Sequence, residues 1–232
     1  MTDAVAGRAL RRDATGEAAG LGVFFRFPWR KNGVLFNLKE EVDFRKEQEP
    51  VFVEAVCGIV GQLHTGRKHL GDRFGRMNEK DIDSISNDQQ LCYSGNFDMV
   101  VQGRPVKAVI KAYIIPPPYA VPNKVPLYVR ASHQFCCLLF AFDVTNADSF
   151  DAAKECIRNM KISLPGKYFL VGNKCDLRGA DPKGKEVQQE FARTQAKQLG
   201  ATAYFECSAK RNINVKPIME AIVRCECDRP HV

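Results

Sequence analysis

The sequence of 232 residues has no apolar run approaching the roughly 18 residues that suggest a membrane-spanning helix. Its nine cysteines include no C-x-x-C pair, so they lack the spacing of a zinc site or a redox pair. Cys136 and Cys137 are adjacent within an apolar run and are interpreted as buried thiols. With no secretory signal ahead of them, these cysteines predict a reduced, intracellular chain and no metal site.

Acidic residues are also missing from one long stretch, because no Asp or Glu occurs between Met99 and Phe142. The whole chain has a formal net charge of +7 and a pI near 8.9, a balance that favours acidic partners. A docking face for an acidic protein or RNA would use the cations of this stretch, although a solvated basic surface is the simpler interpretation. No nucleic-acid-binding motif is present. The cations are Arg104, Lys107, Lys111, Lys124 and Arg130.

Composition divides the chain into three parts. Residues 1–49 are expected to be an N-terminal extension, partly disordered, that docks on the domain, a partner or a lipid surface. The first twenty residues weakly resemble an organelle-targeting segment, but their acidic residues oppose this, so a cytoplasmic location is expected with targeting left open. Residues 50–226 are expected to form one domain, and residues 227–232 a short tail.

From residue 51 onward, short apolar runs alternate with helical patterns, which predicts an α/β fold with a mainly parallel sheet and helices on both faces. Residues 96–103 and 104–115 read as an antiparallel hairpin around Gln102-Gly103. Other strands are expected within residues 51–60, 135–144, 167–177 and 202–210. Helices are expected over about 68–76, 148–160, 185–200 and from about 215.

Three polar loops follow strands of this predicted sheet directly: GQLHTGRK, NKCD and ECSAK. Ligands of open α/β sheets bind beyond the carboxyl ends of the strands, so the three loops are expected to converge on one site. In VGNKCDL, residues 171–177, a carboxylate just past a strand can accept two parallel hydrogen bonds. Guanine offers that donor pair on N1 and its exocyclic amine, whereas adenine does not.

VGNKCDL and FECSAK, residues 205–210, resemble the paired base-recognition motifs of Ras-superfamily small GTPases. The resemblance covers roughly residues 50–225 and is most specific from about Phe135 onward, without separating the Rho, Ras and Rab branches. It implies a P-loop NTPase-like small GTPase fold. It also implies that Asn173 ties the base loop to the phosphate loop and contacts the base, Lys174 packs over the base, and Asp176 reads guanine.

The second motif supplies the other guanine-binding residues that the resemblance implies. Ser208 would brace Asp176, Ala209 would donate its backbone N–H to the guanine carbonyl, and Lys210 would stack on the ring. The alternative is an ordinary polar loop, which the pairing and order of the two motifs make improbable. GTP or GDP is therefore the expected cofactor.

GQLHTGRKHL, residues 61–70, nearly matches the phosphate-binding loop GxxxxGK[ST]. The resemblance places Gly61 and Gly66 at its two glycines, where backbone N–H groups form an anion nest. Arg67 replaces the lysine, and Lys68 replaces the hydroxyl that would bind magnesium. These four residues are the expected phosphate contacts, with magnesium in doubt, because Lys68 repels a metal and could neutralise phosphates without one.

The family's DxxG motif, usually followed by glutamine, is absent after KAYII, and no shift of alignment restores it. Without it the phosphoryl-transfer machinery is incomplete, so no catalytic residue is assigned and weak or absent GTP hydrolysis is expected. The leading hypothesis is a divergent, pseudo-GTPase-like protein that binds guanine nucleotide and serves as an interaction or signalling module. The alternatives are a nucleotide-free scaffold or subunit of an assembly, and an active GTPase completed by a partner.

Two short patterns bear on partners. PPPY, at Pro116–Tyr119, matches the ligand pattern of WW domains, although a rigid surface loop is the simpler interpretation. CEC, at residues 225–227, is similar to the paired cysteines of prenylated Rab tails, but DRPHV follows it and the ending is not a CaaX box. Protein partners are expected, and lipidation is not.

Overall fold

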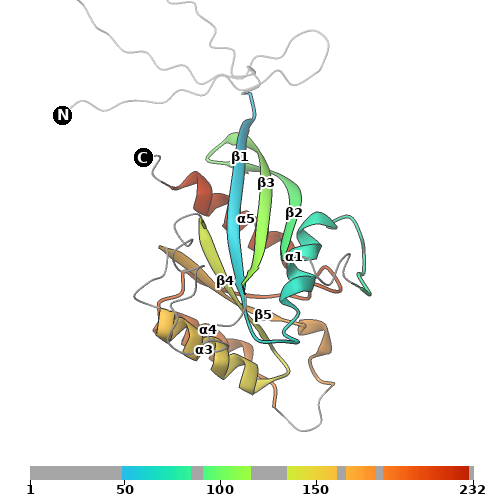
Figure 1. Ribbon diagram of the computed structural model, residues 1–232, viewed down its shortest axis with the longest axis vertical. Helices are drawn as coiled ribbons and strands as arrows, with labels where there is room; N and C mark the ends of the chain where they lie inside the picture. Colours follow the sequence, from blue (N-terminus) through green and yellow to red (C-terminus); the bar gives the residue numbers. More distant parts are fainter. Residues whose placement is uncertain (1–48, 85–90, 116–134, 161–165, 181–184, 230–232) are drawn as a thin grey trace, which may run out of the picture. The chain divides into compact units, whose positions relative to one another are not determined.

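The protein is described by a computed structural model that covers residues 49–84, 91–115, 135–160, 166–180 and 185–229. Its framework is a six-stranded sheet in the order β2-β3-β1-β4-β5-β6 (Figure 1). Only β2 and β3 pair antiparallel, and every other neighbouring pair is parallel. The strands are β1 Val51–Val60, β2 Cys92–Val101, β3 Arg104–Ile115, β4 Cys137–Asp143, β5 Lys167–Asn173 and β6 Ala203–Glu206.

Helices α3 and α4 connect parallel strands, and the described helices cover both faces of the sheet (Figure 1). One face carries α1 and α5, and the opposite face carries α3 and α4, so the domain has three layers. A short 3-10 turn, η3 Cys175–Leu177, follows β5. The helices are α1 Arg67–Gly75, α3 Ala147–Met160, α4 Gln189–Leu199 and α5 Val215–Cys227.

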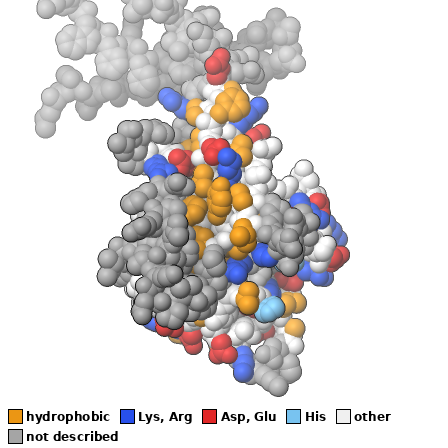
Figure 2. Space-filling model, viewed as in Figure 1, with side chains coloured by type: hydrophobic (Ala, Val, Ile, Leu, Met, Phe, Trp, Pro, Cys, Tyr) orange, Lys and Arg blue, Asp and Glu red, His pale blue; other side chains and the backbone are white. Residues whose placement is uncertain are grey.

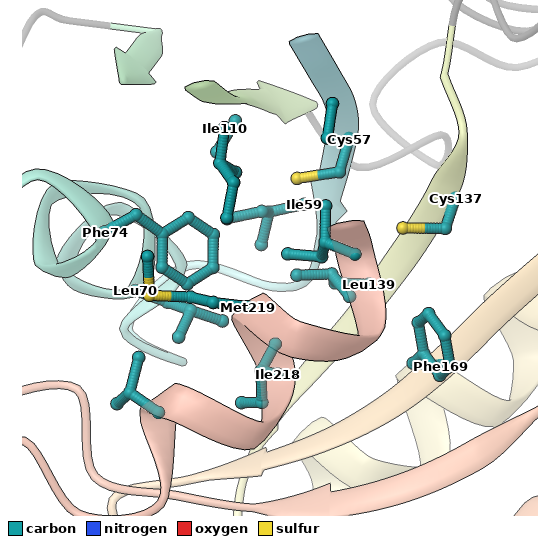
Figure 3. Packing of buried hydrophobic residues seen from close by; sticks show 14 of the residues in the cluster. Cys57, Ile59, Leu70, Phe74, Ile110, Cys137, Leu139, Phe169, Ile218 and Met219 are labelled. Carbon is teal, nitrogen blue, oxygen red and sulfur yellow. The ribbon is translucent and has the colours of Figure 1, made fainter. Parts of the chain in front are cut away.

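The central strands are buried on both faces, which explains why β4, CLLFAFD, is apolar along nearly its whole length. Alternate residues of β1 and β4 face the two helical layers. On one side, α5 packs the predicted stripe that begins at Val215 and Ile218 against the sheet, next to α1. Figure 3 shows Ile218 and Met219 of α5 close to Ile59 of β1 and to Leu70 and Phe74 of α1.

The predicted α/β fold class is confirmed, and two element boundaries differ from the sequence prediction. Strand β2 begins at Cys92 rather than near residue 96, because the hairpin ladder extends to the pair Cys92↔Tyr113. Helix α4 begins at Gln189 rather than near residue 185. The residues before it are extended, and the backbone N–H of Val187 donates to the carbonyl of Val144 at 2.8 Å.

Gly95 shows why β2 tolerates a glycine in mid-strand. The last turn of α1 lies so close that a β-carbon at position 95 would collide with the backbone carbonyl of Phe74. The glycine therefore lets α1 pack directly on the hairpin.

The face of β1 and β3 opposite α5 is open to solvent in part and carries apolar side chains (Figure 2). Cross-strand register places Phe52 beside Lys107, Glu54 beside Val109 and Gly58 beside Tyr113. The exposed fractions are 78% for Phe52, 37% for Val109 and 40% for Tyr113. These three side chains are called the exposed sheet face.

All nine cysteines fall within the described residues and each is a free thiol. Cys136 and Cys137 are buried, as the sequence predicts. Within the described ranges, no group of three or more His, Cys, Asp or Glu side chains is placed to hold a metal ion. None of the described helices has both the length and the apolar character needed to cross a membrane.

Several expectations fall outside the described residues. They are the N-terminal extension, the PPPY segment at Pro116–Tyr119, and the cations Lys124 and Arg130. Of the remaining cations in that stretch, Arg104, Lys107 and Lys111 lie on β3. Lys111 forms an ion pair with Glu54 at 2.8 Å across the sheet, which offsets part of the basic charge there.

Candidate functional site

A cavity of about 230 Å³ lies where the loops after β1, β5 and β6 meet, beyond the carboxyl ends of these strands. Its volume is below that of a typical drug-sized pocket, so it suits one planar part of a ligand. The lining residues are Gly66, His69, Asn173, Lys174, Asp176, Leu177, Ser208, Lys210 and Arg211.

Asn173, at the end of β5, links all three loops. Its Nδ2 donates to the backbone carbonyl of Thr65 at 3.0 Å, and its Oδ1 accepts from the backbone N–H of Ala209 at 3.0 Å. Only 2% of the residue is exposed. Gly66 is required beside it, because its φ is 78° and a β-carbon there would collide with the Asn173 amide. The amide therefore fixes the spacing of the loops around the cavity.

Asp176 has a side-chain oxygen that lacks a hydrogen-bond partner among the described residues. Its Oδ1 is buried, yet it has no hydrogen-bond partner in the described part of the chain. An unpaired buried polar atom costs about 1–3 kcal/mol, and more when it carries charge. Asp176 also lines the cavity, so a ligand whose N–H donor reaches this oxygen would remove the cost.

Lys174 adopts a left-handed conformation, with φ 64°, that directs its stem past Gly66. Its ammonium donates to Oδ2 of Asp143 at 2.6 Å. The other oxygen of Asp143 accepts from the backbone N–H and the hydroxyl of Thr145 at 2.9 and 2.7 Å. Asp143 thus anchors the lysine at the end of β4, and the aliphatic stem remains as one wall of the cavity.

The loop between β1 and α1 is closed by its own arginine. Nη1 of Arg67 donates to the carbonyl of Gly61 at 2.6 Å and to that of Ile115, at the end of β3, at 3.1 Å. Thr65 reinforces the turn, since its hydroxyl donates to the carbonyl of Gln62 at 2.9 Å. The guanidinium is therefore held between the start of the loop and the neighbouring strand.

Behind the cavity, Arg178 and Glu206 join the loops after β5 and β6. Nε and Nη2 of Arg178 donate to the two carboxylate oxygens of Glu206 at 2.6 and 2.8 Å, and Tyr204 donates to the same carboxylate at 2.7 Å. Burial alone would raise the pKa of Glu206, but the hydrogen bonds from Arg178 and Tyr204 outweigh it and hold the pKa below its usual value.

This pKa shift predicts an acid-dependent loss of stability. A carboxyl with a lowered folded-state pKa stabilises the fold above its unfolded pKa, and the contribution is lost as pH falls through the folded value. Native protein should therefore exceed Glu206→Gln in Tm at neutral pH, and the gap should close below about pH 4. Thermal unfolding across pH measures it, with the exposed Glu155→Gln as control. A gap that stays constant with pH would contradict the prediction.

Arg73, on α1, is a supporting residue that the sequence interpretation did not identify. It is fully buried, and its Nε and Nη2 donate at 2.6 Å each to the carbonyls of Ala209 and Lys210. Its Nη1 donates to the carbonyls of Arg76 and Glu79 at 2.9 and 2.6 Å. The guanidinium thus joins α1 to the loop after β6.

A sequence model of the Ras family matches residues 125–227. The Ras-related proteins Rab-3 of Caenorhabditis elegans and Rab-3D of Mus musculus are 36% and 38% identical to this chain, each over 104 residues. Residues 125–227 are therefore similar in sequence to the Ras family. Each alignment covers 44% of this chain and 44% of the relative, so the chain spans less than half the length of these curated relatives.

The matched range includes both expected base motifs, NKCD and ECSAK, and excludes the expected phosphate loop at residues 61–70. Five of the six expected guanine-binding residues line the cavity, and the sixth, Ala209, is buried and donates its backbone N–H to Oδ1 of Asn173. Of the expected phosphate contacts, Gly66 lines the cavity, whereas Gly61, Arg67 and Lys68 lie outside its lining. The five lining residues are Asn173, Lys174, Asp176, Ser208 and Lys210.

Three further lining residues were not among the expected contacts: His69, Leu177 and Arg211. Leu177 directly follows NKCD, so its position beside the base loop was the available signal. Arg211 forms an ion pair with Asp81 at 2.8 Å, which attaches the loop after α1 to the cavity rim. The oxygen of Ser208 accepts from the backbone N–H of Arg211 at 3.1 Å and so shapes the loop itself.

Proposed function

We propose that this protein binds guanine nucleotide, GTP or GDP, in the cavity and uses the bound domain as a protein-interaction or signalling module. The observation that carries the proposal is a cavity bounded by both expected base motifs, one of whose lining residues, Asp176, has a buried and unpaired Oδ1. A guanine ring supplies two adjacent N–H donors on one edge, which match one carboxylate. Adenine presents no such pair, so the same oxygen would stay unpaired against it.

Hydrolysis in this protein is weak or absent. GTP cleavage in this family needs a metal and a residue that positions the attacking water. The chain carries lysine at the metal hydroxyl position and no acidic residue from Met99 to Phe142. Bound nucleotide then acts as a stabilising ligand of the folded state. A partner that completes the machinery would restore turnover, and GTP recovered intact from the purified protein would argue against turnover without one.

The test is to denature the purified full chain and identify the released nucleotide by ion-pair chromatography. The expected result is close to one guanine nucleotide per chain. If the protein emerges empty, GDP at a hundredfold excess over its Kd should stabilise it by about 2.7 kcal/mol, whereas ADP should not. Protein that releases no nucleotide and melts at the same temperature with GDP, GTP or ADP would refute the proposal.

The exposed sheet face supports a second candidate function, that of a nucleotide-free scaffold or assembly subunit. Phe52, Val109 and Tyr113 offer apolar area between charged neighbours, which is a common composition at protein interfaces. Phe52→Ser and Val109→Ser together should then release a stoichiometric partner from the purified complex while leaving Tm unchanged. Retention of the partner by this variant would remove the support for this candidate.

A further inference from the structure

Small GTPases of this family bind Mg²⁺ beside the nucleotide, and the residues around the expected phosphate loop can be compared with the ligands that Mg²⁺ needs. Mg²⁺ takes oxygen ligands in near-octahedral geometry, usually a hydroxyl and one or two carboxylates besides phosphate. The position that supplies the hydroxyl is Lys68, the second residue of α1. An ammonium has no lone pair to donate and carries the same sign of charge as the metal, so this ligand does not fit.

Among the described residues, the ends of the two strands that flank β1 offer no fitting carboxylate either. In the family, the aspartate of the DxxG motif near the magnesium ion follows the strand that corresponds to β3. Here the end of β3 lies in the stretch from Met99 to Phe142, which has no Asp or Glu. On the other side of β1, the end of β4 carries Asp143. Both of its oxygens are already bonded, to Thr145 and to the Lys174 ammonium at 2.6 Å. A metal there would have to displace a cation.

Arg67, the residue before Lys68, supplies a fixed positive charge at the start of α1. Its guanidinium donates to the carbonyls of Gly61 and Ile115, at 2.6 and 3.1 Å. The arginine side chain therefore joins the loop to the end of β3. A planar guanidinium that is fixed by backbone acceptors keeps its position whether or not an ion is present. Arg67 and Lys68 together place two permanent charges at the start of α1.

We infer that this site holds its guanine nucleotide without a divalent cation, with Arg67 and Lys68 neutralising the phosphates and the Asp176 cavity holding the base. The inference rests on the proposed function and adds the metal independence of that same site. It reverses the expectation for a Ras-superfamily domain, in which chelation of the metal loosens the nucleotide. The consequence is a protein whose nucleotide content does not respond to the magnesium level.

The test measures the dissociation of a fluorescent GDP, N-methylanthraniloyl-GDP, from the full chain after addition of excess GDP. The rate is compared in buffer with MgCl₂ and in buffer with excess EDTA. The inferred site predicts two rates that agree within about threefold, because no ligand of the nucleotide is removed by chelation. Acceleration by EDTA of about tenfold or more, with binding retained in MgCl₂, would overturn the inference and leave the proposed function standing. A probe that binds in neither buffer would instead overturn both.

Lys68→Ala tests the charge that takes the place of the metal, and Lys197→Ala, at an exposed position near the end of α4, is its control. Lys68→Ala should weaken the fluorescent GDP by about tenfold in both buffers, since a charge-assisted contact is lost. Guanosine, which has no phosphate, should bind both variants equally. Full GDP affinity in Lys68→Ala would overturn the assigned role of this lysine.

Discussion

Asp176→Asn is expected to lower the affinity for GDP by about a hundredfold, close to 3 kcal/mol, because one hydrogen bond to guanine is lost and the other loses its charge. The amide presents one acceptor and one donor in place of two acceptors, so its NH₂ opposes a donor of the base. The measurement is the Kd for fluorescent GDP by titration. Asp98→Asn, with the same change of charge at an exposed position on β2, should bind like the native protein.

For the nucleotide-free protein, we expect Asp176→Asn to leave the Tm unchanged or to raise it. Oδ1 of Asp176 is buried and unpaired before a ligand arrives, so removing its charge should not lower the Tm of the nucleotide-free form. Loss of affinity together with an unchanged or higher Tm would identify Asp176 as a recognition residue. Unchanged GDP affinity, in contrast, would show that Asp176 does not read the base.

The sequence predicted the strands and helices well because their patterns are local. The all-apolar run of β4 and the stripe of α5 each signal burial without knowledge of the partner element. The boundaries that differ were decided by tertiary contacts. Strand β2 reaches Cys92 through pairing with β3, and residues before α4 are held extended by Val144. Gly95 also masked the start of β2, because glycine weakens a strand pattern.

In the candidate site, too, the local motifs were predictable from the sequence and the long-range contacts were not. The motifs NKCD and ECSAK could be recognised in the sequence because each expected base-binding residue lies within a short segment after a strand. The contacts that support them join residues far apart in sequence. Arg178 meets Glu206 across 28 positions, and Asn173 meets Thr65 across 108. A local motif cannot reveal such pairs, although the inward position of Arg73 between Leu70 and Phe74 was a usable signal.

Arg73→Ala is expected to destabilise the domain by about 3–5 kcal/mol, which lowers Tm by roughly 10 °C in a domain of this size. The arginine is fully buried and serves four backbone carbonyls, and alanine leaves those acceptors without donors while opening a cavity. Chemical denaturation measures the change. Arg224→Ala, at an exposed position on α5, should change stability by less than about 1 kcal/mol.

Arg73→Lys separates the positioning role of this residue from its packing. Lysine restores charge and volume but not the planar fork that reaches Ala209 and Lys210 at the same time. The loop after β6 should then shift relative to α1, and GDP should bind more weakly by about tenfold even well below the Tm. Because Asn173 also holds Ala209, the base loop itself should keep its backbone. Arg73→Lys could instead lose stability but bind GDP as the native protein does. The hydrogen bonds of Arg73 would then serve folding alone, and Asn173 would position the loop after β6.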